Sequence, residues 1–439
     1  MKRLRVSENR RFLEWEDGSP FIWLGDTAWE LFHRLRLEEA EAYLENRRTK
    51  GFTLVQAVAL AELDGLETPN VYGEIPLLDN DPRKPNERYF AFVDSIITKA
   101  DQLGIFVGLL PTWGDKVEKL NHGKGPVIFD PESARHYGEW IGRRYKHQSN
   151  LVWINGGDRS GGEANHPVWT ALAEGIKSVD PNHLMTFHPL GGENGRSSSE
   201  WFHHAAWLDF NLAQSGHRKR DLPNFKLVAR DYERIPIKPC LDGEPRYEDH
   251  PVDWKPLELG WFDDSDARQA AYWAVFSGAF GHTYGCHPVW QMYAAGREPV
   301  SYVRRSWREA LDLPGAAQML HLKRFLSTRE FVWRVPDQSL IQPGEIPATD
   351  CENRAVRDEK NTRAWIYLPF GGKVAVNLER LEAKSLRAVW LDPRSGQTLP
   401  ASEAWNSRSA QLSAPSAGRG QDWVLSLSDL DTHAAPAET

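Results

Sequence analysis

The sequence predicts an α/β protein: a (β/α)8 TIM barrel followed by a C-terminal β-sandwich domain. Apolar runs of strand length recur through the first 290 residues and alternate with segments of helical periodicity. The runs are apolar throughout rather than alternating, as expected for parallel strands that are covered on both faces. After about residue 328 the helical periodicity stops and short β-like runs replace it.

The predicted barrel elements follow one another in regular order. The strands are Phe21–Gly25, Thr53–Ala59, Ile105–Leu110, Leu151–Asn155, Leu184–His188, Trp207–Gln214, Ile237–Asp242 and Gly278–Tyr284. The helices are Glu38–Lys50, Asn86–Leu103, Pro131–Lys146, Pro167–Val179, Ser198–Ala205, Asn224–Arg234 and Ser265–Phe276, with a long helix, Tyr302–Leu326, after the last strand. An open doubly wound sheet is the alternative, and the lack of a glycine-rich phosphate loop after the first strand disfavours it.

Two regions flank the predicted barrel. Leu4–Val6 and Arg11–Trp15 predict a small hairpin, which would cap the lower end of the barrel. The sandwich strands are predicted at Ala364–Pro369, Lys373–Asn377, Ala388–Leu391 and Trp423–Leu427. We therefore assign residues 1–328 to the barrel with its hairpin and 329–439 to the sandwich, and we predict a disordered tail over Asp431–Thr439.

Composition and charge exclude several classes of function. The chain has 439 residues, 41% of them apolar, and a net charge of −8 without a block of lysine and arginine, which argues against nucleic acid and an anionic membrane surface as partners. No apolar run is long enough to span a bilayer, and no apolar segment of a secretory signal follows the charged residues 1–8. The cysteines, Cys240, Cys286 and Cys351, are odd in number and widely spaced, which favours a reducing cytoplasm over a disulfide framework or zinc site. We predict no cofactor, and the oligomeric state is left open.

Nearly every predicted strand is followed by polar or aromatic side chains. The C-terminal ends of parallel barrel strands converge on the face where barrel enzymes act, so these side chains would line one site. The predicted substrate-binding residues are Asp26, Trp29, Gln56, Trp113, Asp115, Asn155, His188, His217, His282, Tyr284 and Trp290. Glu62 and Gln214 also lie at strand ends. Trp113 and Trp290 are the best candidates for stacking on a sugar ring, although tryptophan is also ordinary core material.

Two carboxylates stand out among these residues. Asp158 and Glu244 each follow an apolar strand and lie beside glycines. Two carboxyl groups from separate strands are the catalytic groups that most glycosidases use to cleave a glycosidic bond. Pro245 favours an extended backbone at Glu244, which would project its side chain from a rigid strand end. Asp242 lies two residues earlier, on the expected same face, and is assigned a supporting role. Asp158 taken alone could simply cap a loop.

At these residues the chain resembles the apiosidase-like glycoside hydrolases (family 140) over nearly its whole length. The motifs that carry the resemblance are Leu24–Trp29, Gln56–Gly65, Leu110–Lys116, Asn155–Asp158 and Asp242–Pro245. Trp390–Gly396 is similar to part of the sandwich domain, often labelled collagen-binding, that follows such barrels. The resemblance implies a (β/α)8 barrel with Asp158 as general acid/base and Glu244 as nucleophile.

The acid in this family is displaced relative to other retaining barrel glycosidases, which carry Asn-Glu at the end of strand four. Here Asn155 stands in place, but the acid is an aspartate that follows Gly156 and Gly157. An aspartate side chain is one methylene shorter than a glutamate side chain. A bend that glycine permits can carry the backbone closer to the substrate and so compensate.

We therefore predict a retaining exo-acting glycosidase that releases terminal apiose, or a related furanose or pentose, from plant-derived oligosaccharides or glycosides. The two carboxyl groups should lie about 5–5.5 Å apart, and Asp158 should have the higher pKa. Two other functions are open. In a metal-dependent sugar isomerase or epimerase, a divalent ion would be held by some of His188, His217, Asp242, Glu244 and His282. The other is a non-catalytic carbohydrate-binding protein.

Overall fold

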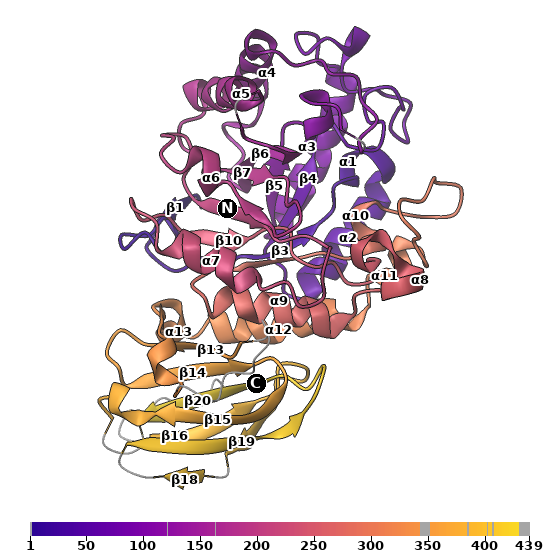
Figure 1. The fold of residues 1–439 in the computed structure, drawn as a ribbon. Helices are drawn as coiled ribbons and strands as arrows, with labels where there is room; N and C mark the ends of the chain where they lie inside the picture. Colours follow the sequence, from indigo (N-terminus) through magenta and orange to yellow (C-terminus); the bar gives the residue numbers. More distant parts are fainter. Residues whose placement is uncertain are drawn as a thin grey trace.

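The computed structural model describes residues 2–120, 122–162, 164–342, 352–383, 386–401, 403–405 and 408–429. The predicted tail, Asp431–Thr439, lies outside these residues. Figure 1 shows an α/β domain that packs against a smaller domain of antiparallel strands.

Eight parallel strands form the barrel. Six are paired in the order β11–β3–β4–β5–β6–β7, and β9 and β10 pair in parallel between β7 and β11. Backbone hydrogen bonds join the two arcs, from Asp209 N to Met185 O (2.8 Å) and from Phe280 N to Cys240 O (3.0 Å). The strands are β3 (Leu24–Thr27), β4 (Leu54–Val58), β5 (Phe106–Leu110), β6 (Leu151–Arg159), β7 (Met185–Pro189), β9 (Asn211–Gln214), β10 (Cys240–Asp242) and β11 (His282–Tyr284). The predicted TIM barrel is confirmed.

Helices cover the outside of the strand ring. The larger ones are α2 (Leu37–Thr49), α3 (Glu87–Gln102), α4 (Pro131–Tyr145), α5 (His166–Val179), α7 (Asn224–Tyr232), α9 (Asp264–Val275) and α12 (Pro314–Leu326). Short ones are α1 (Leu31–Arg34), α6 (Ser199–Phe202), α8 (Pro256–Leu259), α10 (His287–Trp290), α11 (Trp307–Ala310) and α13 (Arg329–Val332). Side-chain caps mark several starts, such as Asp130 before α4 and Asp263 before α9. Within the described ranges, none of these helices has the length and apolar character needed to cross a bilayer.

The prediction of one long helix over Tyr302–Leu326 is wrong. The structure divides this segment into the single turn α11 and the longer α12. Pro314 begins α12, and the residue before it, Leu313, is extended (φ −60°, ψ 144°). Proline has no N–H to continue a helix and disfavours helical backbone in the residue before it, so the apolar periodicity continues where the helix cannot.

Side chains of the barrel strands alternate between two environments, and this alternation decides which residues can reach the site. One core lies inside the strand ring and at its ends and includes Trp23, Leu54, Phe106, Val152 and Leu212. The other lies between strands and helices and includes Leu24, Val55, Val107, Trp153 and Phe187. Neighbouring residues of a strand therefore belong to opposite sides of the barrel wall.

The N-terminal hairpin closes one end of the barrel. Strands β1 (Leu4–Val6) and β2 (Leu13–Trp15) pair in antiparallel. The Trp15 ring lies 5.6 Å from that of Phe106, the first residue of β5, and 5.4 Å from that of Phe21. These contacts place the hairpin at the N-terminal ends of the strands, opposite the face where the site is expected.

The C-terminal domain consists of two antiparallel sheets around one core. The first sheet contains, in spatial order, β12 (Val335–Pro336), β13 (Arg354–Arg357), β14 (Arg363–Leu368), β20 (Trp423–Asp429), β16 (Leu386–Leu391) and β17 (Thr398–Pro400). The second contains β15 (Gly371–Asn377), β19 (Ser409–Ala417) and β18 (Glu403–Trp405). Ile366 and Leu425 of the first sheet share a core with Val374 and Leu412 of the second, as the sequence predicts for a sandwich.

Helix α9 lies in the barrel domain, on the side that faces the smaller domain (Figure 1). Its residues from Asp266 to Val275 are all buried. Arg268 donates hydrogen bonds from Nε and Nη2 to the carboxylate of Asp422, which precedes β20, at 2.7–3.0 Å. The Tyr272 ring stacks on that of Tyr367 in β14, with centroids 5.1 Å apart. The C-terminal domain therefore covers the face of α9 that would otherwise meet solvent.

Candidate active site

Glu244 is the most heavily hydrogen-bonded residue of the site. It follows β10, and only 4% of its surface is exposed. Its Oε2 accepts from His188 Nε2 at 2.9 Å, and its Oε1 accepts from His217 Nε2 at 3.0 Å and from Gln214 Nε2 at 2.8 Å. Burial alone would raise the pKa of Glu244, but the hydrogen bonds from the two histidines outweigh it and hold this pKa below the usual range. Glu244 is therefore an anion with fixed orientation.

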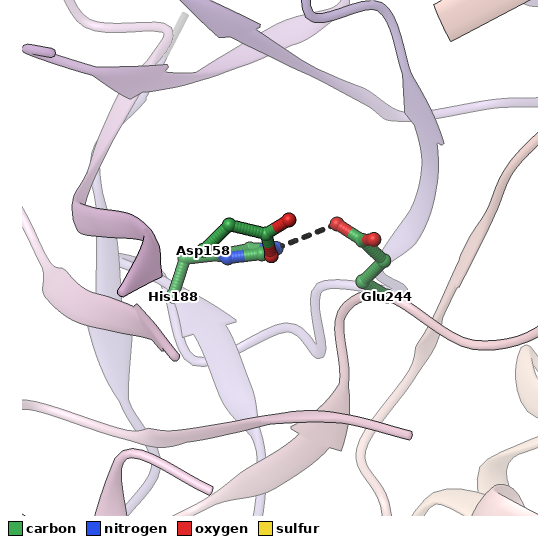
Figure 2. Close-up of side chains that lie close together, drawn as sticks. All are labelled: Asp158, His188 and Glu244. Atoms are coloured by element: carbon green, nitrogen blue, oxygen red, sulfur yellow. Dashed lines mark hydrogen bonds and ion pairs between the residues drawn. The ribbon is translucent and has the colours of Figure 1, made fainter. Parts of the chain in front are cut away.

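Asp158 lies at the end of β6 beside Glu244. Its Oδ1 accepts from Gln214 Nε2 at 2.7 Å, and its side chain is 20% exposed. Burial, followed by the negative charge of Glu244, raises the pKa of Asp158. An oxygen of Asp158, a ring nitrogen of His188 and an oxygen of Glu244 all lie within 4.8 Å of one another. Figure 2 shows the side chains of Asp158 and His188 facing Glu244. Two carboxyl groups with opposite pKa shifts thus face each other.

The backbone before Asp158 explains why two glycines precede it. Gly156, Gly157 and Asp158 have φ values of 92°, 123° and 53°. A Cβ on Gly156 would lie 2.3 Å from His188 O, and one on Gly157 would lie 2.9 Å from Trp113 Cε3. This left-handed stretch bends the strand end and delivers Asp158 to the pair, which agrees with the bend expected from the sequence.

We expect Gly156→Ala to lower kcat about a hundred-fold, because displacing the backbone moves the Asp158 carboxyl by a fraction of an ångström to an ångström. Steady-state kinetics would measure kcat, and circular dichroism would verify that the variant is folded. Gly73→Ala is the matched control, since Gly73 also has a positive φ (83°), but a Cβ added there would meet no described atom within 4 Å. Equal kcat values for the two variants would contradict the role of this bend.

Two tryptophans hold His188 in place. The Trp29 ring lies 5.4 Å from His188 and 5.1 Å from Trp113, which in turn lies 5.7 Å from His188. Burial lowers the pKa of His188, but the hydrogen bond to Glu244 outweighs it, and the net shift is upward. The tryptophans therefore form the wall behind the histidine. Trp290 belongs to the same buried cluster and donates from Nε1 to His287 Nδ1 at 3.2 Å.

His217 packs against two neighbouring rings. It lies 4.4 Å from Tyr247 and 4.3 Å from His250, which lies 4.5 Å from His287. Burial lowers the pKa of His250 far below its usual value and that of His287 to about 4. These two histidines are therefore neutral near neutral pH and serve as packing that aims His217 at Glu244.

Two further predicted residues support the backbone around the pair. Gln56 crosses the barrel interior and donates from Nε2 to Gly243 O at 2.9 Å, directly before Glu244. Asp115 accepts from the backbone N–H groups of Lys124 and Gly125 at 3.1 and 2.9 Å and pairs with Lys116 Nζ at 2.7 Å. Asp115 thus shapes the loop after β5.

The structure corrects the assignment of four predicted substrate-binding residues, which face the helices instead of the barrel interior. Asp26 accepts from Arg47 Nε (2.5 Å) and Tyr43 OH (2.6 Å) of α2, and Asn155 donates to Trp169 O (2.8 Å) of α5. Tyr284 donates to Glu248 on the outer side of β11. Thr283 faces Trp23 inside the barrel, so His282, which precedes it, lies on the same outer side as Tyr284. Alternation along each strand turns all four away from the pair.

Asp242 also faces outward, so the same-face prediction for Asp242 and Glu244 is wrong. Its carboxylate accepts from Ser215 Oγ at 2.6 Å and from Asn224 Nδ2 of α7 at 2.9 Å. The strand ends at Asp242, and the chain bends at Gly243 before Glu244. Asp242 and His282 lie on the outer side of the barrel wall. The five residues considered as metal ligands therefore do not meet at one point.

Within the described part of the chain, a single group of three residues could hold a metal ion: Asp158, His188 and Glu244. His188 Nε2 and Glu244 Oε2 already share a hydrogen bond of 2.9 Å, so a metal would have to replace it. The donor set is compatible with a divalent ion, but Asp158, His188 and Glu244 already take part in the hydrogen bonds of the carboxylate pair.

Three functional residues were not selected from the sequence. Gln214 bridges both carboxylates, and the apolar run of β9 gives no sign of which side its last residue faces. Burial, followed by the charge of Asp158, raises the pKa of Glu62 well above its usual value, so the Glu62 carboxyl is electrostatically linked to the pair. Arg159 is buried and donates from Nη1 to Asp158 O at 2.8 Å. Its position directly after Asp158 is the signal that could have identified it.

Comparison with known proteins agrees with this geometry. Residues 7–333 match a family model described as "Apiosidase-like, catalytic domain", and residues 335–428 match one described as "Putative collagen-binding domain of a collagenase". No curated protein sequence matches the chain.

Solved structures resemble the whole chain. One described as a glycoside hydrolase is 32% identical, with 98% of each chain covered and a TM-score of 0.88. A glycoside hydrolase family 5 structure from Bacteroides vulgatus ATCC 8482 is also 32% identical, covers 100% of this chain and 96% of its own, and has a TM-score of 0.90. A family 5 mannosidase from Rhizomucor miehei, 12% identical over 75% of this chain and 100% of its own with a TM-score of 0.51, shares the fold. The protein is therefore a glycosidase that belongs to the apiosidase-like glycoside hydrolases.

Proposed function

We propose that this glycosidase acts with retention of configuration, with Asp158 as general acid/base and Glu244 as nucleophile. The observation that carries the proposal is the carboxylate pair: one oxygen of Asp158 and one of Glu244 lie within 4.8 Å of each other, and a single amide nitrogen of Gln214 bonds to both residues. This spacing favours the carboxyl separation of about 5–5.5 Å that retaining enzymes use. Inverting enzymes need about 6.5–9.5 Å between the two groups to admit a water molecule.

The reaction would take two steps. In the first, a Glu244 oxygen bonds to the anomeric carbon while the glycosidic C–O bond breaks and Asp158 gives its proton to the leaving oxygen. In the second, Asp158 takes a proton from water, the water oxygen bonds to the anomeric carbon, and the bond to Glu244 breaks. Sugar is released, and both carboxyl groups return to their starting protonation states.

The pKa shifts support this division of labour. The pKa of Glu244 is lowered, so this residue is ionised and nucleophilic; the pKa of Asp158 is raised, so this residue holds the proton that it must donate. Activity should therefore be lost as pH falls through the lowered pKa of the pair and as pH rises through the raised one.

We infer that the substrate is a glycoside with terminal apiose, or a related furanose or pentose, such as a plant-derived oligosaccharide or glycoside. The family match supports the sugar class. Exo action is supported by the burial of the site, since Glu244, Trp29 and Trp113 are all nearly inaccessible to solvent. A nucleophile buried to this depth favours a chain end over the middle of a polymer.

The test is a screen of aryl glycosides and plant glycosides in which ¹H NMR follows the first sugar anomer released. We expect that anomer to have the configuration of the substrate. Release of the opposite anomer would contradict Glu244 as nucleophile. The same assay after exhaustive chelation tests the isomerase or epimerase alternative, which predicts loss of activity, and binding without turnover would favour a carbohydrate-binding protein.

A further inference from the structure

One amide nitrogen touches both carboxylates of the site. Gln214 Nε2 lies 2.7 Å from Asp158 Oδ1 and 2.8 Å from Glu244 Oε1. Gln214 is the last residue of β9, and the adjacent Ser215 is tied to Asp242 through its Oγ at 2.6 Å and its N at 3.3 Å. The amide therefore extends from a strand end whose backbone is held by a buried carboxylate.

The orientation of this amide follows from its neighbours. Glu244 accepts hydrogen bonds from His188 and His217 and has no proton to give. Turning the Gln214 amide over would set its oxygen against Glu244 Oε1, two acceptors with no proton between them. The NH2 group must therefore face the carboxylates, and it supplies one hydrogen to each.

We propose that Gln214 is a positioning residue that occupies one oxygen of each carboxyl group and so determines which oxygens react. The inference rests on the proposed roles of Asp158 and Glu244. Oδ1 of Asp158 accepts from the amide and cannot carry a proton in that direction, which leaves Oδ2 as the atom that delivers the proton. Oε1 of Glu244 accepts two hydrogen bonds and Oε2 accepts one, which makes Oε2 the better nucleophile.

The surroundings of the two free oxygens agree with this assignment. His188 Nε2 lies 2.9 Å from Oε2, and Figure 2 shows the Asp158 and His188 side chains together on the side of Glu244 to which this hydrogen bond points, so Oε2 is turned toward the acid. Oδ2 of Asp158 lies 4.0 Å from Nε2 of His122, a half-exposed residue, and thus points to the open side of the site where a leaving group would depart. Asp158 Oδ2 would then donate its proton to the glycosidic oxygen, and Glu244 Oε2 would attack the anomeric carbon to which that oxygen is bonded.

Gln214→Met tests the proposal, because methionine has a similar shape but donates no hydrogen bond. In the variant, the ionised forms of Asp158 and Glu244 each lose a stabilising hydrogen bond, so both pKa values should rise. The acidic and the basic limb of the kcat/KM profile should therefore both move to higher pH. We also expect kcat to fall about ten- to a hundred-fold, the effect of losing hydrogen bonds to charged groups, with KM changed much less.

Gln269→Met is the matched control, since Gln269 is a buried glutamine in α9, outside the strand ring; its profile should match that of the wild type. A second measurement is independent of turnover: ¹³C NMR titration of labelled carboxyl groups, assigned with Asp158→Asn and Glu244→Gln. Lower activity with both limbs and both NMR pKa values unmoved would overturn the proposal, as would full activity. If the wild type cleaves no glycoside, the proposed function fails, while the titration still decides the inference about Gln214.

Discussion

Asp158→Asn and Glu244→Gln should each lower kcat on a natural glycoside by about four orders of magnitude or more, as expected when one member of a catalytic unit is removed. Both changes remove a carboxyl group while keeping the size of the side chain. The fold should survive at position 158, since asparagine tolerates the positive φ of 53° found there. Thermal unfolding would verify that each variant is folded.

The two variants should differ in one informative respect. Asp158→Asn should retain much of its kcat/KM on a dinitrophenyl glycoside, whose leaving group needs no proton, while its kcat stays low because the second step still lacks its base. Glu244→Gln should be inactive on every substrate. Asp64→Asn is the matched control: Asp64 follows the second barrel strand with a positive φ (61°), and among the described side chains it bonds only to Thr68 Oγ1. Robust turnover of a natural glycoside by either catalytic variant would contradict the assignment.

Asp422→Ala should destabilise the protein by about 3–5 kcal/mol, the cost of leaving one partner of a buried ion pair without the other. Arg268 and Asp422 are 1% and 2% exposed, and their carboxylate–guanidinium contact includes three hydrogen bonds. Urea unfolding followed by tryptophan fluorescence would measure the change. Because the pair lies at the domain interface, kcat of the folded variant should match that of the wild type.

The exposed pair Arg83–Glu132 provides the control. These side chains are 42% and 85% exposed, so Glu132→Ala should change the free energy of unfolding by less than about 1 kcal/mol. If Asp422→Ala has an equally small effect, the two domains do not depend on this contact. A double-mutant cycle with Arg268→Ala would separate the pair's coupling from the cost of the orphaned charge.

The order of barrel strands could be predicted because each is a continuous apolar run, which parallel strands covered on both sides require. The same property hides which side each residue faces. A run without alternation does not distinguish Asp26 and Asn155, which face helices, from Gln56 and Gln214, which face the interior. Side-chain direction at strand ends was therefore the part of the site that the sequence could not supply.

The two carboxylates could be located for a different reason. Glycines beside a strand-end acid mark a bend that only glycine permits, and that bend exists before Asp158. The ring contacts that aim His217 depend on His250 and Tyr247, which reach it from another loop. Contacts between separate loops leave no local pattern in a sequence.

The burial of α9 on every side has a consequence for how this protein can evolve. A helix on the outside of a barrel usually leaves its polar residues in contact with water, but every residue of α9 from Asp266 to Val275 is buried. A barrel separated from its C-terminal sheets would expose Tyr272 and Trp273, and we expect it to aggregate. The second domain is thus not an interchangeable module, and any exchange between relatives has to carry α9 with it.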